Sequence, residues 1–253
     1  MKRILAGNWK MNLLQAEARA LWDEIAAGCG ARAGIACAVF PPATLLAPLA
    51  AARREGDPKL GAQNCHFERK GAFTGEISAE QARDAGAHHA LVGHSERRSL
   101  FCESDLVARQ KLLAAWRAGL HPVLCIGETL AERERRETRD VLARQLRRAL
   151  EGAPPKTPLW VAYEPVWAIG TGVVASVEEV AEAHQWVREE LDAAGRGAGE
   201  PVPILYGGSV DPRNAGPLSA TPGVDGFLVG GASLNAASFL EIARLLETAT
   251  AGR

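Results

Sequence analysis

A glutamate followed at once by a proline is the clearest chemical signal in the sequence. Glu164 comes directly after residues 159–163, a short run of bulky apolar residues that is typical of a strand buried on both faces. Pro165 keeps Glu164 out of the helical region, so the chain leaves the strand extended and enters a loop. That loop holds large apolar residues and two glycines, and it ends at Ser176, whose S-V-E-E sequence predicts a helix start. This arrangement is typical of a catalytic base beneath a lid; a solvated glutamate in a surface turn is the alternative.

The same loop contains a pattern that resembles a dinucleotide-binding motif. Residues 170–175 read G-T-G-V-V-A, which matches the G-x-G-x-x-G/A pattern between a strand and a helix. In that motif the first glycine lies in the tight turn directly after the strand. Here six residues separate the strand from Gly170. We therefore favour the lid over a nucleotide site, and we expect no cofactor.

Composition limits the kinds of partner and site. The chain has 253 residues, 47% hydrophobic and 23% charged, and a formal net charge of -1, so nothing points to a nucleic acid or another polyanion as partner. No apolar stretch approaches the ~18 residues that span a membrane, and no signal-peptide pattern is seen. The five cysteines include no C-x-x-C pair, and the six histidines lack metal-ligand spacing. We expect a cytoplasmic protein with reduced cysteines and no metal.

The elements that must position these residues follow a regular alternation. Eight short apolar runs are typical of buried strands: 4–7, 35–40, 60–62, 90–92, 122–126, 159–163, 204–206 and 227–229. Between and after them lie eight amphipathic stretches: 13–27, 44–54, 79–85, 105–118, 130–150, 177–194, 214–218 and 237–248. Capping boxes begin at Ser78, Thr129 and Ser176, and Asp211 followed by Pro212 predicts a further N-cap.

Eight strand–helix units in about 250 residues favour one α/β domain over residues 1–253, closed as a (β/α)8 barrel. No linker or shift in composition suggests a domain boundary. The alternative is an open, doubly wound sheet, which usually shows its glycine-rich turn after the first strand. The sequence has no such turn there.

In a barrel of this kind the residues just after each strand gather at one face, where the chemistry is found. Polar residues and glycines follow seven of the eight strands. They are Asn8, Trp9 and Lys10; Gln63 and Asn64; His94, Ser95, Glu96 and Arg97; Gly127 and Glu128; Glu164; Gly207, Gly208 and Ser209; and Gly230 and Gly231. Each alone has a simple structural interpretation, but their convergence predicts a site.

Three of these groups suggest roles. Lys10, although lysine is usually solvated, follows the first strand directly and would point a cation inward. His94 is placed to polarise a ligand carbonyl, with Glu96 beside it and with Arg97 and Arg98 available to pair with Glu96. The glycine pairs after the last two strands would let backbone N–H groups approach an anion such as phosphate, with a short helical turn at residues 232–234; tight turns that require glycine are the alternative.

At this point the sequence resembles one family, triosephosphate isomerase, along nearly its whole length. The matching stretches are AGNWK at 6–10, GAFTGE at 71–76, VGHSERR at 92–98, CIGE at 125–128, AYEPVWAIGTG at 162–172, YGGSV at 206–210 and VGGASL at 229–234. They occur in the order that the family shows. The resemblance implies interconversion of dihydroxyacetone phosphate and D-glyceraldehyde 3-phosphate through an enediolate, in glycolysis and gluconeogenesis, without a cofactor.

The resemblance also implies roles for individual residues. Glu164 would be the base, His94 the neutral electrophile and Lys10 the cation, with Asn8 supporting the lysine. Phosphate would be bound by backbone around Gly170, Ser209, Gly230 and Gly231. Residues next to these groups would be Ser95, Glu96 and Cys125. The lid would be Pro165, Val166, Trp167, Ala168, Ile169, Gly170, Thr171 and Gly172.

Assembly and lid motion are two further implications. The loop from Gly71 to Glu76 would clasp a second copy and bring Thr74 near the partner's site, which makes a homodimer. The chain departs from the family where the lid ends, because branched Val173 and Val174 replace the polar residues usual there; such residues restrict the backbone and affect lid kinetics. Two rivals remain: another phosphate-binding barrel such as a lyase or aldolase, which would need a Schiff-base lysine or a metal set, and a barrel without catalysis.

Overall fold

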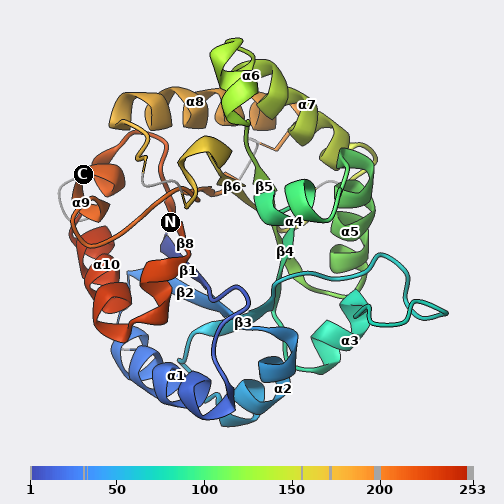
Figure 1. Cartoon of the computed structure of the whole chain (residues 1–253), viewed down its shortest axis with the longest axis vertical. Helices are drawn as coiled ribbons and strands as arrows, with labels where there is room; N and C mark the ends of the chain where they lie inside the picture. Colours follow the sequence, from blue (N-terminus) through green and yellow to red (C-terminus); the bar gives the residue numbers. More distant parts are fainter. Residues whose placement is uncertain are drawn as a thin grey trace.

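Eight parallel strands close into a barrel in the computed structural model, and helices surround it (Figure 1). The structure describes residues 2–30, 32, 34–154, 156–170, 173–196 and 201–249. Each strand pairs with its neighbours in sequence, and β1 pairs with β8 to close the ring. The strands are β1 (Arg3–Asn8), β2 (Ile35–Phe40), β3 (Lys59–Ala62), β4 (His89–Val92), β5 (His121–Ile126), β6 (Trp160–Tyr163), β7 (Ile204–Tyr206) and β8 (Gly226–Val229). The closed (β/α)8 barrel expected from the alternation is confirmed.

The helices follow the expected order with three differences. They are α1 (Gln15–Cys29), α2 (Ala43–Ala52), α3 (Ala79–Asp84), α4 (Ser95–Leu100), α5 (Asp105–Arg117), α6 (Leu130–Glu134), α7 (Thr138–Leu150), α8 (Val177–Ala193), α9 (Ala215–Ala220) and α10 (Ala236–Thr248). Two 3-10 turns, η1 (Val166–Ala168) and η2 (Gly231–Leu234), lie after β6 and β8. The capping boxes at Ser78, Thr129 and Ser176 are all formed.

The first difference is that the single helix expected over 130–150 is two helices. Arg136 has φ +60°, which a right-handed helix does not allow, and Glu137 is the N-cap of α7. The charged run there has no apolar stripe, and α6 buries none of its residues, so nothing holds one continuous helix against the barrel.

The other differences concern helix starts. The N-cap expected at Asp211 is wrong, because α9 begins at Ala215 and residues 212–214 form a turn. Asp211 precedes that turn, and its carbonyl accepts the Ala215 N–H at 3.0 Å. Helix α4 was not expected at all, since its sequence has no apolar periodicity and Ser95 is its one buried residue.

Strand alternation divides the core into two layers. One face of each strand points into the barrel, where Ala6, Leu91, Val123 and Ala162 belong to an inner cluster. The other face packs against the helices in a larger outer cluster. Because side chains alternate, the inner face that carries Trp160 and Ala162 in β6 continues to Glu164, just past the strand. The fold therefore aims the residue after β6 into the barrel mouth.

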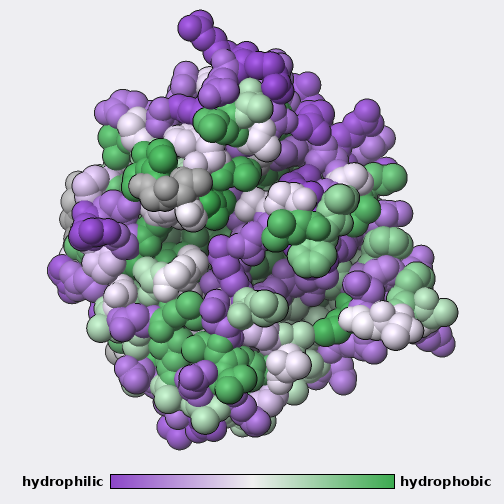
Figure 2. Space-filling view, in the orientation of Figure 1, coloured by the Kyte–Doolittle hydropathy of each residue, from purple (hydrophilic) through white to green (hydrophobic). Residues whose placement is uncertain are grey.

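Polar side chains cover most of the face seen in Figure 2, where apolar residues gather in limited patches. The loop between β3 and α3 projects away from the barrel (Figure 1). Within the described ranges no helix combines the length and the apolar character that crossing a membrane requires.

Candidate active site

The carboxylate of Glu164 meets the imidazole of His94 at the carboxyl ends of the strands. Glu164 Oε1 lies 3.0 Å from His94 Nε2, and Glu164 Oε2 accepts the Ser95 backbone N–H at 2.8 Å. Both side chains are buried, with Glu164 only 2% exposed. Asn8, from the end of β1, places its amide nitrogen 3.3 Å from the same His94 nitrogen. Strands β1, β4 and β6 thus bring three of the predicted residues together.

The start of α4 orients the imidazole. His94 is the N-cap of this helix, and its Nδ1 accepts the backbone N–H of Glu96 at 3.3 Å. A nitrogen that accepts a hydrogen bond carries no proton, so the ring proton of neutral His94 lies on Nε2, which faces Glu164. The imidazole is therefore arranged to donate a hydrogen bond at the point where the carboxylate now lies.

Lys10 adopts a strained backbone conformation. Its φ is +52°, in the left-handed region that few non-glycine residues occupy. Its N–H donates to the Asn8 side-chain oxygen at 3.0 Å, and its carbonyl accepts the Gln63 amide at 2.8 Å. These bonds hold a conformation that the sequence pattern alone does not reveal.

The partner expected for Glu96 is wrong. Lys10 Nζ pairs with Glu96 Oε1 at 2.6 Å, whereas Arg97 pairs with Glu103 at 2.5 Å and Arg98 with Asp105 at 2.7 Å. Both arginines therefore bind carboxylates from the chain just after α4. Glu103 lies between α4 and α5, and Asp105 is the first residue of α5. Glu96 is thus joined to the predicted site by its ion pair with Lys10.

Close neighbours of Glu164 leave little free volume around it. A Cβ atom on Gly127 would lie 1.7 Å from the Glu164 carbonyl oxygen, and one on Gly207 would lie 3.0 Å from Glu164 Cγ. The Cys125 thiol is fully buried within hydrogen-bonding reach of the Glu164 carboxylate. Burial raises the pKa of this thiol well above its usual value, and the charge of Glu164 raises it further, so the thiol stays protonated.

A pocket of about 420 Å³ opens above Glu164 and His94. Its lining combines the polar residues of the strand ends with the glycines predicted for phosphate. These are Asn8, Lys10, His94, Glu164, Gly170, Gly207, Gly208, Ser209, Gly230 and Gly231. Ser209 Oγ donates to the carbonyl of Ala168 at 2.9 Å, which joins the β7 end to the predicted lid. The helical turn expected at 232–234 is confirmed as η2, which begins at Gly231.

The predicted lid begins as the turn η1, and Glu128 anchors it. The Trp167 Nε1–H and the Tyr163 hydroxyl both donate to Glu128 Oε1, at 2.8 and 3.2 Å, and the Arg133 guanidinium lies 4.3 Å from the centre of the Trp167 ring. Burial raises the pKa of the Glu128 carboxyl, and the Trp167 and Tyr163 bonds oppose that rise. The sequence showed Glu128 only as a residue after β5, and C-I-G-E gave no sign of this contact. Thr171 and Gly172 lie outside the described residues.

The remaining predicted residue, Thr74, is exposed on the projecting loop and lies apart from the pocket lining. Within the part of the chain that the structure describes, no three His, Cys, Asp or Glu side chains are grouped as metal ligands.

Comparisons with known proteins point to one family. The family model described as triosephosphate isomerase matches residues 3–246. A curated triosephosphate isomerase from Bdellovibrio bacteriovorus is 48% identical, covering 96% of this chain and 99% of that protein. One from a Bradyrhizobium species is also 48% identical, with 96% and 98% covered. The crystal structure of triosephosphate isomerase from Bartonella henselae superposes with a TM-score of 0.88 at 41% identity, covering 97% of this chain and 99% of that one.

Proposed function

The chain belongs to the triosephosphate isomerase family, isomerases that interconvert dihydroxyacetone phosphate and D-glyceraldehyde 3-phosphate, and we propose that Glu164, His94 and Lys10 carry out this reaction here. The observation that supports the assignment is the convergence of the Glu164 carboxylate and the His94 Nε2–H, 3.0 Å apart, at the base of one pocket. A base and a neutral donor at that separation can act on adjacent carbon and oxygen atoms of one small substrate.

The proton transfer follows from this geometry. Glu164 takes a proton from C1 of dihydroxyacetone phosphate. The C1–H electron pair becomes the C1=C2 double bond of the enediolate, and the carbonyl π pair moves to the C2 oxygen, which accepts a hydrogen bond from the His94 Nε2–H. Nε2 has one proton, which now faces Glu164, so the substrate oxygen must replace the carboxylate at His94 when it binds. The carboxylate then moves toward the substrate carbon. His94 Nε2 gives its proton to the C2 oxygen and takes the C1 hydroxyl proton in return, so the C1 oxygen becomes the aldehyde oxygen as Glu164 returns its proton to C2. The Lys10 ammonium stabilises the negative charge that develops. Well-studied members of this family are themselves the standard example of such an acid–base pair.

The phosphate group and the lid complete the proposal. Backbone N–H groups at Gly170, Ser209, Gly230 and Gly231 would bind the phosphate, and no cofactor is needed. Residues 165–172 would close over it and exclude water, which protects the enediolate from losing its phosphate. Val173 and Val174 are each about half exposed, at 51% and 49%, so closure would bring apolar groups toward the pocket and change the rate of lid motion.

Turnover by the purified chain tests the proposal. We expect rapid interconversion of the two triose phosphates in excess chelator. Glu164→Gln should lower kcat by about 10²–10⁴-fold, since the amide cannot take a proton. Glu178→Gln, at an exposed position in the first turn of α8, is the matched control and should turn over normally. A Glu164→Gln enzyme with normal kcat would rule out this base.

We also propose a cytoplasmic homodimer of one-domain subunits. The loop from Gly71 to Glu76 projects from the barrel (Figure 1), and its Phe73 side chain is 42% exposed. A groove of about 660 Å³ lies beside Lys10. Met11 and Phe101, which line this groove, are 96% and 63% exposed. Apolar residues this exposed are typical of a surface that another chain covers. The chain has a mass of 26.9 kDa, and light scattering should give twice that value. Thr74→Arg should lower the measured mass because it places a charge in the contact between subunits. A monomeric wild-type protein at micromolar concentration would contradict the dimer.

A further inference from the structure

Helix α4 orients both groups of the proposed acid–base pair. The backbone N–H of Ser95, its first residue, binds Glu164 Oε2, and the N–H of Glu96, its second, binds His94 Nδ1. Any shift of α4 therefore moves the base and the electrophile at the same time.

Apolar packing does little to hold α4 in place. The helix has six residues, and Ser95 is the one that is buried. Leu100, its last residue, is 74% exposed. A helix with so little buried apolar surface depends on polar contacts for its position.

Arg98 supplies these contacts from the middle of α4. Its Nε donates to the Gly93 carbonyl at 2.8 Å, and its Nη2 donates to the Cys125 carbonyl at 3.4 Å. Gly93 immediately precedes His94, and the Cys125 thiol lies beside Glu164. Arg98 thus joins α4 to the end of β4, next to His94, and to the end of β5, where the Cys125 thiol lies beside Glu164.

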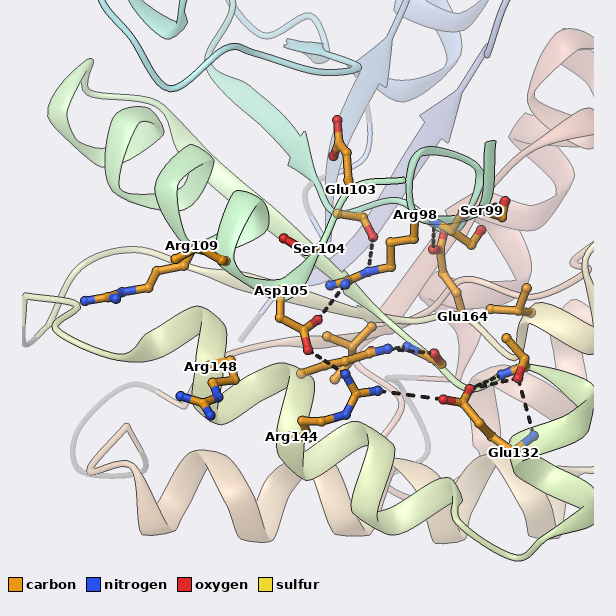
Figure 3. Close-up of a pocket in the computed structure, with 18 of the residues that line it drawn as sticks. Arg98, Ser99, Glu103, Ser104, Asp105, Arg109, Glu132, Arg144, Arg148 and Glu164 are labelled. Carbon is orange, nitrogen blue, oxygen red and sulfur yellow. Dashed lines mark hydrogen bonds and ion pairs between the residues drawn. The ribbon is translucent and has the colours of Figure 1, made fainter. Parts of the chain in front are cut away.

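Asp105 and Arg144 fix the orientation of Arg98. Arg98 Nη1 binds Asp105 Oδ1 at 2.7 Å, and Arg144, from α7, binds Asp105 Oδ2 at 2.7 Å. Figure 3 shows this row of side chains along a second pocket, about 700 Å³ in volume, with Glu164 at its inner end. Open space borders the Arg98 side chain there, so hydrogen bonds and charge hold it in position rather than packing on all sides.

We propose that Arg98 is a positioning residue for the isomerisation, held by Asp105 and acting through α4 on His94 and Glu164. This inference rests on the roles proposed above for those two residues. The groups proposed to bind phosphate are Gly170 in the lid, Ser209 after β7, and Gly230 and Gly231 after β8, whereas the partners of Arg98 in the described structure are Gly93, Asp105 and Cys125. Loss of Arg98 should therefore impair the chemical step and leave phosphate binding intact.

Kinetics of three variants test the proposal. Displacing reacting groups by about 1 Å costs roughly 100-fold in rate, so Arg98→Met should lower kcat by about that factor with KM within about twofold. Arg98→Lys keeps the positive charge on a single nitrogen but loses the planar fork, so its kcat should lie between those of the wild type and Arg98→Met. Arg148→Met is the matched control, because Arg148 lines the same pocket from α7 and makes no hydrogen bond or ion pair with α4 in the described structure. Its kcat should be normal.

Ligand binding separates positioning from general destabilisation. Inorganic phosphate probes the phosphate site alone, whereas 2-phosphoglycolate adds a planar, negatively charged carboxylate that resembles the enediolate. Arg98→Met should weaken 2-phosphoglycolate binding by about the factor lost in kcat and leave phosphate binding unchanged. In Arg98→Ala, millimolar guanidinium should enter the open pocket and restore kcat in a saturable way, and urea should not.

Three results would overturn the role of Arg98: a normal kcat in Arg98→Met, equal weakening of both ligands, or a loss of rate that follows subunit dissociation or unfolding. Glu164→Gln measured in parallel distinguishes the two proposals. If Glu164→Gln is slow and Arg98→Met is fast, only the positioning role fails. If Glu164→Gln is fast, the proposed base is wrong, and the positioning role fails with it.

Discussion

Strand β4 has a histidine near each end, and the two differ in their partners rather than in their burial. His89 begins the strand inside the barrel and is 2% exposed; His94 follows its other end and is 6% exposed. Both nitrogens of His94 have polar neighbours, the Glu96 N–H on one side and Glu164 on the other. Nδ1 of His89 has no hydrogen-bond partner among the described residues.

Aromatic rings surround His89 where polar groups surround His94. The His89 ring stacks on Trp160 at 4.4 Å and lies 5.1 Å from His121, which begins β5. Burial holds the pKa of His89 well below its usual value and lowers that of His121 to about 4. Burial thus keeps the imidazoles at the amino end of the barrel neutral, whereas hydrogen bonds orient the imidazole of His94 at the carboxyl end. Oriented hydrogen bonds can direct a proton, and burial alone cannot. This agrees with the general rule that such barrels carry their chemistry at the carboxyl end and residues for stability at the amino end.

The largest effect that the comparison predicts is on stability, at the amino end. Trp160→Ala removes a 93% buried ring from the cluster with His89 and His121, since Trp160 is 7% exposed. We expect the free energy of unfolding to fall by about 3–5 kcal/mol, as for other buried aromatic residues. Denaturant unfolding measures the loss, and kcat per folded molecule should stay normal. A large fall in the kcat of fully folded Trp160→Ala would contradict the division between an amino end that stabilises the fold and a carboxyl end that carries the chemistry.

The next effect is on catalysis, at the carboxyl end. His94→Gln replaces the aimed imidazole Nε2–H by an amide on a flexible side chain that the Glu96 N–H no longer orients, and kcat should fall by about 10²–10³-fold, as when one donor to a developing oxyanion is lost. His121→Gln is the matched control, because this imidazole lies at the opposite end of the barrel, and its kcat should be normal. Steady-state assays at one temperature compare the two. Equal losses in both variants would contradict a specific role for His94.

Sequence patterns were sufficient to find the strands but failed to place the first residue of several of them. Apolar runs located every strand, but β4 and β5 each begin one residue earlier than expected, at His89 and His121. Arg3 and Lys59 extend β1 and β3 in the same way. Polar residues at strand starts interrupt an apolar run although the backbone pairing continues, so hydrophobicity alone places these boundaries too late.

The candidate site shows a similar limit. The residues that follow the strands could be identified because parallel strands deliver their ends to one face. The partners of Arg98 and Glu128 could not, since they depend on how α4, α5 and the lid turn come together in space. The φ of +52° at Lys10 could not be anticipated either, because asparagine and glutamine contacts impose it on a residue that rarely adopts it.

A third prediction uses pH to sharpen the contrast. For His121 the folded pKa of about 4 lies below the unfolded value of about 6.5, so the unfolded chain binds more protons between these values. The stability that neutral His121 contributes is present above pH 6.5 and is lost as the pH falls toward 4. His121→Gln should flatten the pH dependence of stability in this range, by at most about 1.4 kcal/mol per pH unit and by less because the ring is partly exposed. Thermal unfolding from pH 7 to 4.5 measures the slope; an unchanged slope would show that His121 does not titrate on unfolding.

The smallest effect concerns two lysines with positive φ. Lys10, at the carboxyl end, has φ +52°, and Lys156, in the loop that precedes β6 at the amino end, has φ +60°. Glycine relieves about 1–2 kcal/mol of this strain but gives the unfolded chain about 0.4–1 kcal/mol more entropy, so Lys156→Gly should stabilise the fold by about 0.5–1 kcal/mol. Its turnover should be unchanged. Lys10→Gly should gain similar stability and lose most of its activity, because there the strain holds the ammonium proposed to stabilise the enediolate. Chemical denaturation and steady-state kinetics on the two variants test this prediction. If Lys156→Gly is less stable than the wild type, contacts as strong as those at Lys10 hold the positive φ of Lys156.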